Sequence, residues 1–420
     1  MATNFKKRRS LPKLVLNKFD SVPFEVLCSF LYLGEMFNLM MVSKMIRVKV
    51  YKVGSSHAKV KNFDIAQRLM AKFPKITLRA PNILKKINDS QIITLTRLVE
   101  LRCDYSMELT DACLKHLINL TKLRFLGSIF SEKAIMQLPK IKSLSIHENT
   151  TIEDIHMKPL TSITELSISG CQISDIGLTY LKNLRKLDLL GSWQNNITGR
   201  GLRVLTQLNS LALNNYTNNI SEIDLIRLTN LRELKIIAIR FTYDFLSYMT
   251  FLEKLTIRDE TNPWFTADIS FKNTHRLTSL SVIDNCGITG KTFGKLVHLK
   301  HLVLRETQLN GKYLRNLRGI THLEIGCNKK IKREHLVNLV SVKTLVLFLD
   351  RANNISDEMV GELKNVEVIK IICDNYFFWA ISVEAFKPLK NLKKVIVTNK
   401  YDVSKYEKFF DERGVELLRL

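Results

Sequence analysis

The chain has 420 residues and a formal net charge of +24, with 64 lysines and arginines against 40 aspartates and glutamates. This length exceeds what one compact hydrophobic core normally serves, so the chain needs several domains or a repeat architecture. The charge favours acidic partners and is concentrated early, since residues 1–90 hold 18 basic and 5 acidic residues. Glu35 interrupts the most apolar segment, Val26–Val42, so we expect no membrane partner.

Residues 1–18 form a basic segment that opens with Lys6-Lys7-Arg8-Arg9. Such a run is typical of nuclear import signals and nucleic-acid contacts, and it is equally typical of a solvated chain terminus. We predict a basic flexible tail, and both interpretations of its charge stay open.

Residues 19–51 have apolar side chains at helical spacing. Ser21 before Pro23 suits a helix start, Gly34 interrupts the pattern, and Ser43 can begin a third short helix. Three such helices are too small to bury their own apolar residues. We therefore expect them to pack on the end of a larger fold or on another chain.

Within this segment, residues 29–47 read SFLYLGEMFNLMMVSKMIR. They follow the pattern S-F-L-x-L-x-D-L…V-S-K-x-W-R at Ser29, Phe30, Leu31, Leu33, Val42, Ser43, Lys44 and Arg47. The pattern resembles the F-box, the helical module by which substrate receptors dock onto the Skp-type adaptor of SCF ubiquitin ligases. Ile46 stands where that family has tryptophan.

The resemblance implies an F-box-like module over residues 19–60 that binds a Skp-type adaptor and, through it, a cullin–RING complex. The adaptor-binding residues that it implies are Phe19, Pro23, Phe24, Leu27, Leu31, Leu33, Met36, Leu39, Val42 and Ile46. The alternative is a helical cap that shields the first repeat of the following domain. One segment can serve both roles.

Residues 61–72 are predicted to form a linking helix, followed by a first, irregular strand at Pro74-Lys75-Ile76-Thr77-Leu78. From residue 73 onward the sequence becomes repetitive. In Ile163–Asn183, Leu166 and Ile168 alternate with polar residues as in a strand with one buried side. With Ile163 and Cys171 they follow the L-x-x-L-x-L-x-x-N/C pattern of a leucine-rich repeat.

The same pattern recurs fifteen times at intervals of 21 to 26 residues, within the range of this repeat class. Its first apolar positions are Phe73, Leu98, Leu120, Ile141, Ile163, Leu184, Leu208, Leu231, Leu252, Leu277, Leu299, Ile320, Val342, Val366 and Leu392. We predict an α/β leucine-rich-repeat solenoid, a horseshoe, over residues 73–420. A helix from Ser404 and a strand at 415–420 would close its end.

The chemistry-bearing residues do not form a recognisable catalytic motif, so we expect neither an enzyme nor a cofactor. His301 and His322 share a strand position in consecutive repeats, with Glu324 nearby. Such a group could hold a metal, or it could be solvated side chains on a polar face, and we predict no metal site. The cysteines are odd in number and scattered, which indicates reduced thiols and a cytoplasmic or nuclear protein. They are Cys28, Cys103, Cys113, Cys171, Cys286, Cys327 and Cys373.

Candidate target-binding residues fall into two groups. Aromatic residues follow the strands of longer repeats, where a rigid scaffold carries variable loops. They are Trp193, Tyr216, Trp264, Phe265, Phe377 and Trp379. Outward strand positions add Arg258, Arg305, Phe348 and Ile372, because the outward side chains become more apolar in the late repeats. The alternatives are rings folded back onto the rim and irregular late repeats.

The repeats predict a binding scaffold, and the F-box resemblance implies a non-catalytic substrate-recognition subunit of an SCF-type ubiquitin ligase. Its repeats would bind a target protein, and the positive charge of the chain favours an acidic one. The alternative is a stand-alone leucine-rich-repeat interaction scaffold whose N-terminal helices are only a cap. Nucleic acid is the weakest candidate partner, because the basic N-terminal region has few aromatic residues and the repeats are only mildly basic.

Overall fold

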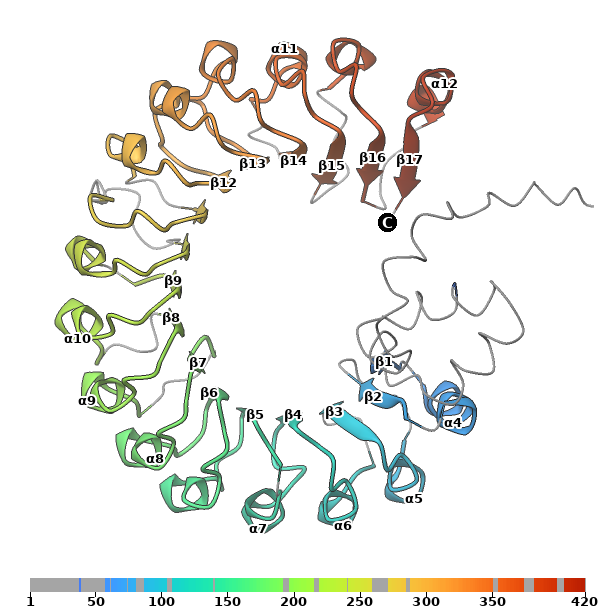
Figure 1. Ribbon diagram of the computed structural model, residues 1–420, viewed down its shortest axis with the longest axis vertical. Coiled ribbons are helices and arrows are strands. Elements are labelled where there is room, and N and C mark those ends of the chain that lie inside the picture. Colours follow the sequence, from blue (N-terminus) through green and yellow to red (C-terminus); the bar gives the residue numbers. More distant parts are fainter. Residues whose placement is uncertain are drawn as a thin grey trace, which may run out of the picture. The chain divides into compact units, whose positions relative to one another are not determined.

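A computed structural model describes residues 38, 57–60, 62–73, 75–80, 87–103, 108–138, 140–191, 196–214, 219–239, 241–258, 271–284, 288–349, 354–373, 381–398 and 404–419 (Figure 1). The chain divides into two compact units, Met1–Ile146 and His147–Leu420. All ten predicted adaptor-binding residues lie outside the described residues.

The first unit contains parallel strands that pair in chain order, with a short helix after each. Its elements are β1 (His57–Lys59), α4 (Phe63–Lys72), β2 (Thr77–Ala80), α5 (Asp89–Ile92), β3 (Leu98–Arg102), α6 (Asp111–Leu114), β4 (Lys122–Leu126) and α7 (Glu132–Met136). Strand β5 (Ser143–His147) includes the last residues of this unit.

The linking helix is confirmed as α4, which begins where the Asn62 side chain accepts a hydrogen bond from the Ile65 N–H. The start of the sheet differs from the prediction. Strand β1 precedes α4 and pairs with β2, which runs from Thr77 to Ala80 and not from Pro74. The sequence did not reveal β1 because a three-residue strand is too short to show the repeat pattern.

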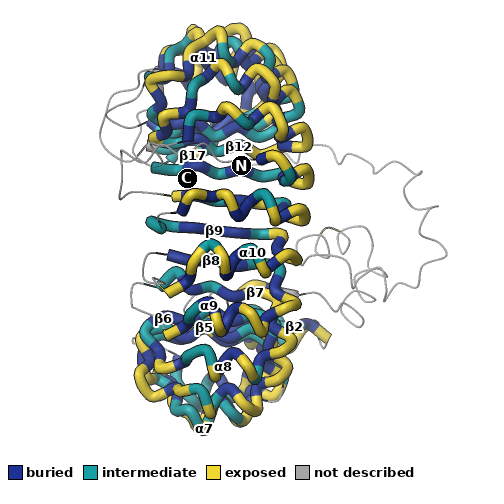
Figure 2. Tube along the Cα trace, turned by 90° about the vertical axis from the view of Figure 1, so that its left-hand side faces the viewer, coloured by how far each residue is buried: buried dark blue, intermediate teal, exposed yellow. Residues whose placement is uncertain are grey.

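The second unit continues the pattern over twelve described strands, β6 to β17, each parallel to its neighbours in chain order. Its elements up to β10 are η2 (Asp154–Met157), β6 (Glu165–Ser169), α8 (Asp175–Thr179), β7 (Lys186–Asp188), α9 (Gly199–Arg203), β8 (Ser210–Asn214), α10 (Glu222–Ile226), β9 (Glu233–Ile237), η3 (Asp244–Tyr248) and β10 (Lys254–Arg258). In Figure 2, β8 and β9 are drawn largely in the colours of buried and intermediate residues.

The remaining elements are β11 (Ser279–Ile283), η4 (Phe293–Lys295), β12 (His301–Arg305), η5 (Gly311–Asn316), β13 (His322–Ile325), η6 (Arg333–His335), β14 (Thr344–Leu349), α11 (Asp357–Gly361), β15 (Val368–Cys373), η7 (Val383–Phe386), β16 (Lys394–Val397), α12 (Ser404–Glu412) and β17 (Glu416–Arg419). The last two confirm the predicted closing helix and strand. All fifteen predicted first apolar positions are buried. The fold is therefore the predicted α/β leucine-rich-repeat solenoid.

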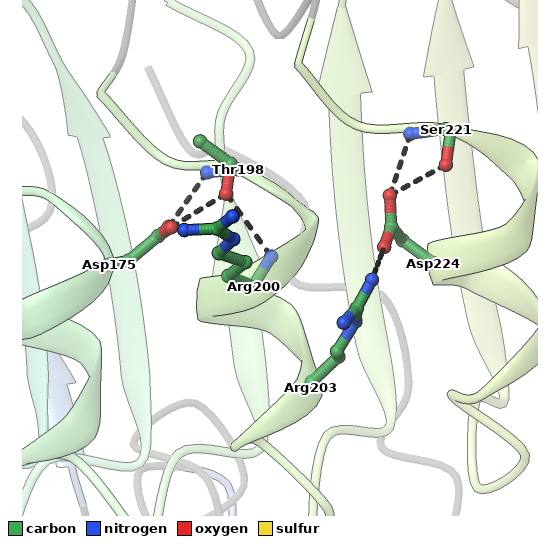
Figure 3. A network of polar contacts seen from close by, with 6 residues as sticks. All are labelled: Asp175, Thr198, Arg200, Arg203, Ser221 and Asp224. Atoms are coloured by element: carbon green, nitrogen blue, oxygen red, sulfur yellow. Dashed lines mark hydrogen bonds and ion pairs between the residues drawn. The ribbon is translucent and has the colours of Figure 1, made fainter.

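Acidic side chains near the helix starts join neighbouring repeats (Figure 3). Asp175 accepts hydrogen bonds from the Thr198 N–H and hydroxyl of the next repeat, at 2.7 and 2.6 Å. Asp224 accepts from Ser221 and forms an ion pair with Arg203 of the preceding helix, at 3.1 Å. These bonds satisfy helix N-terminal groups and hold consecutive repeats in one register.

The residue after a strand often has a left-handed backbone, which turns the chain out of the sheet. Glycine fills this position at Gly127 and Gly170, but Ala238, Asp284 and Glu306 also have positive φ, between 49° and 55°. Such angles cost energy for any residue with a Cβ atom.

Among the residues that the structure describes, no helix is long and apolar enough to cross a membrane.

Candidate functional site

The outward residues of β10 to β15 form a continuous surface, which we call the β10–β15 face. Strand pairing aligns them in three rows. The first row is Lys254, Ser279, His301, His322, Thr344 and Val368; the second is Thr256, Ser281, Val303, Glu324, Val346 and Lys370; the third is Arg258, Ile283, Arg305, Gly326, Phe348 and Ile372. Since neighbouring strands are about 4.8 Å apart, side chains within a row can touch.

The first row contains the histidine pair that the sequence placed side by side. His301 and His322 are paired in the β12–β13 register, with ring centroids 5.5 Å apart. Burial lowers the pKa of His322, and the adjacent His301 acts in the same direction. Within the described ranges, no group of three His, Cys, Asp or Glu side chains could hold a metal ion.

The second row places Glu324 between Val303 and Val346. Burial raises the pKa of the Glu324 carboxyl, while the positive charges of Arg305 and Lys370 act to lower it. Val346 lies in this outward row, but only 5% of it is exposed. We attribute this to the longer Glu324 and Lys370 side chains, which flank it in the register and shield it.

The third row contains a direct contact across an intervening strand. The Arg305 guanidinium lies over the Phe348 ring, with Cζ 4.0 Å from the ring centroid. Gly326, the residue directly after the intervening strand β13, leaves the necessary space, because a Cβ atom there would lie 3.2 Å from Phe348 Cβ and 3.3 Å from Arg305 Cγ. A larger residue at position 326 would press on both side chains.

The ion pair between Arg305 and Glu324 is incomplete. The Arg305 Nε lies 3.5 Å from Glu324 Oε1, and this buried nitrogen makes no hydrogen bond. The distance is longer than a charge-assisted hydrogen bond, which normally spans about 2.7–2.9 Å. By contrast, Arg258 Nε lies 2.8 Å from Asp284 Oδ2, within good hydrogen-bonding distance. The two arginines of this row therefore differ in how well their charges are paired.

The described target-binding candidates are Arg258, Arg305, Phe348 and Ile372. Arg305 and Phe348 are in contact, Ile372 pairs with Phe348 in the β14–β15 register, and Ile283 separates Arg258 from Arg305. Trp193, Tyr216, Trp264, Phe265, Phe377 and Trp379 lie outside the described residues. The sequence pattern alone did not point to Gly326, Asp284 or Lys370. The glycine could have been found, since it occupies a position where neighbouring repeats carry Arg305 and Phe348.

No model of a known protein family matches this chain, and no curated protein matches it. Solved leucine-rich-repeat structures do. An internalin (inlF) from Listeria monocytogenes is 18% identical, with 79% of this chain and 88% of that chain covered and a TM-score of 0.41. TLR13 in its complex with ssRNA13 is 19% identical, with 88% of this chain but only 56% of that chain covered and a TM-score of 0.44. Neither likeness bears on what this chain binds.

Proposed function

We propose that the chain is a non-catalytic protein-interaction scaffold and that its β10–β15 face binds a target protein. The observation that carries the proposal is the Arg305–Phe348 contact across Gly326, in a row that also presents Ile283 and Ile372. Half-buried aromatic and arginine side chains among apolar neighbours have the composition of interface hot spots.

We further propose that the chain is the substrate-recognition subunit of an SCF-type ubiquitin ligase. In this role residues 19–60 bind a Skp-type adaptor, and the repeats present the target to the cullin–RING complex in the cytoplasm or nucleus. The F-box resemblance of residues 29–47 supports this finer function. The alternative is a stand-alone interaction scaffold with an N-terminal helical cap.

A binding assay with a purified Skp-type adaptor separates these two roles. We expect the full chain to bind the adaptor and the double variant Leu31→Lys, Leu39→Lys to lose binding, because lysines would place charge in the apolar interface. A matched control is Ile176→Lys with Ile223→Lys, since these isoleucines are 60% and 66% exposed on helices of the repeats. Failure of the unmodified chain to bind the adaptor would leave the stand-alone scaffold.

We also propose that the aromatic residues after the strands contact the target. Trp264→Ala and Trp379→Ala should then weaken target capture without a change in melting temperature. Lowered melting temperature with unchanged capture would assign these rings to packing on the scaffold.

A further inference from the structure

We propose that the β10–β15 face selects a partner segment in which a carboxylate lies near a large apolar side chain, and that Arg305 binds this carboxylate. This inference rests on the proposed function, because it names the partner chemistry for the surface that binds a target protein. The partner is a protein segment with an acidic residue.

Arg305 has binding capacity that its present neighbours do not use. Its guanidinium is held in place over the Phe348 ring, at 4.0 Å from the centroid, so little side-chain freedom remains to be lost on binding. Its contact with Glu324 is long, at 3.5 Å, so this carboxylate does not occupy the guanidinium. The Nε is itself buried, but the Arg305 side chain is 28% exposed, so a partner meets the outer N–H groups of the guanidinium. A partner carboxylate can accept the two parallel N–H donors of a guanidinium, which Glu324 does not do here.

The charge around Arg305 is unbalanced toward positive. Glu324 is the carboxylate of the second row, and the charges of both Arg305 and Lys370 act on it. The neighbouring basic residues are better paired, Arg258 with Asp284 and Lys254 with Glu233. An acidic group of a partner therefore complements this part of the face.

Apolar side chains begin directly beside Arg305. Phe348 lies two strands away and Ile372 three, which corresponds to about 10 and 14 Å. An extended segment crossing the strands advances about 3.3 Å per residue, and every second side chain points to the same side. When a carboxylate of the partner segment binds Arg305, a residue two to four positions away in that segment can therefore place an apolar side chain on Phe348 or Ile372.

A polyanion such as single-stranded RNA fits the face less well. A chain of phosphates would be repelled by the Glu324 and Asp284 carboxylates along its length, and the one phenyl ring of the three rows, Phe348, already has Arg305 over it. Single-stranded nucleic acid binding normally uses aromatic stacking along an electropositive groove. We therefore commit to a protein partner and make RNA an outcome of the test.

The test begins with selection of phage-displayed random dodecapeptides on the full chain, with the Arg305→Ala variant as the counter-selection surface. We expect Arg305-dependent peptides that contain Asp or Glu two to four positions from Phe, Trp, Leu or Ile. The selected peptide is then synthesised in matched carboxylate and amide forms, Glu against Gln. We expect the amide form to bind at least about tenfold more weakly, the loss of one charge-assisted pair.

Protein variants locate the effect. Arg305→Ala should weaken the carboxylate peptide about tenfold, and Arg305→Lys should lie between the two because it keeps the charge but loses the bidentate geometry. Glu324→Gln should tighten binding, because it removes the competing carboxylate. The matched control is Lys235→Ala on β9, an exposed cation of the second row outside the face, which should change affinity by less than about twofold.

The outcomes separate the inference from the function on which it rests. Peptides that depend on Phe348 but bind equally well as amides would overturn the inference and retain a protein-binding face. Absence of any peptide that depends on Arg305 or Phe348 would overturn both. Stronger binding of oligo-uridylate than of the selected peptide at this face would also overturn the inference. The amide comparison uses the unmodified chain, so it holds even if a variant folds poorly.

Discussion

The outward faces of β6–β8 and of β12–β15 share one backbone arrangement but treat their polar groups differently. Toward the ends of the early strands the outward side chains are small and locally bonded: Asp188 Oδ1 accepts from the Leu190 N–H at 3.0 Å, and Asn214 Nδ2 donates to the Gly191 carbonyl at 2.6 Å. Ser169 and Asn214 are only 2% and 6% exposed. These groups are already satisfied within the repeats.

The late strands carry larger side chains whose interactions are incomplete. Arg305 stacks on Phe348 but lacks a hydrogen bond at Nε, and burial keeps the pKa of Glu324 raised. The comparison shows that the strand register defines the scaffold, whereas the outward side chains determine whether a face is closed or available to a partner. Five predictions test this difference between the two regions.

The largest loss of folding stability is expected when core leucines are replaced, and the loss should be similar in both regions. Leu187 on β7 and Leu304 on β12 are fully buried. Leu187→Ala and Leu304→Ala should each destabilise the fold by about 2–5 kcal/mol, measured by chemical denaturation. Lys186→Ala, on the exposed side of β7, should stay within about 0.5 kcal/mol. A cost at Lys186 equal to that at Leu187 would contradict the strand register.

A second comparison uses the glycines of the two faces. A Cβ atom at Gly191 would lie 1.6 Å from Ser169 Oγ and 2.9 Å from its Cα, so Gly191→Ala must move backbone and should cost about 1–3 kcal/mol. At Gly326 the closest approach would be 3.2 Å, and Gly326→Ala should cost less than about 1 kcal/mol. Thermal denaturation measures both.

The Gly326→Ala variant also tests whether the Arg305–Phe348 contact contributes to peptide binding. Because the new methyl group presses on Arg305 and Phe348, it should weaken binding of the selected acidic peptide more than it lowers stability. Equal affinity of the variant and the unmodified chain would show that the Arg305–Phe348 contact does not define the binding surface.

The Ala238→Gly variant tests the energetic cost of a left-handed backbone at the residue that follows a strand. The φ of Ala238 is 55°, whereas the equivalent turn after β6 uses Gly170 at 64°. Ala238→Gly should raise the free energy of unfolding by about 0.5 kcal/mol, because relief of the strained angle exceeds the entropy gained by the unfolded chain. Gly170→Ala should lower it. A lowered free energy of unfolding for Ala238→Gly, or a raised one for Gly170→Ala, would contradict this account.

The smallest effect concerns pH. The raised pKa of Glu324 favours its protonated form in the folded state, so its contribution to stability is present below the pKa of the unfolded chain and is lost as pH rises through the folded value. Glu324→Gln should therefore gain stability relative to the unmodified chain between about pH 4 and pH 7. Denaturation curves at the two pH values test this, and a pH-independent difference would contradict the burial of the carboxyl.

The sequence alone determined the scaffold of this protein. The alternation of apolar and polar residues assigns each strand one buried side, and a slip of one residue would move the apolar side chains to the other side. The spacing of 21 to 26 residues between repeats then sets the register between neighbouring strands. The sequence placed His301 beside His322, and Leu166 and Ile168 on the buried side of one strand, and the structure confirms both.

Only the tertiary structure decided which outward residues are covered and which face is left incompletely paired. Val346 is buried although it belongs to an outward row, and the Arg305–Phe348 contact has room because Gly326 between them has no side chain. Strand β1 became visible only through its pairing with β2. These features arise from contacts between residues of different repeats, which the pattern within one repeat does not contain.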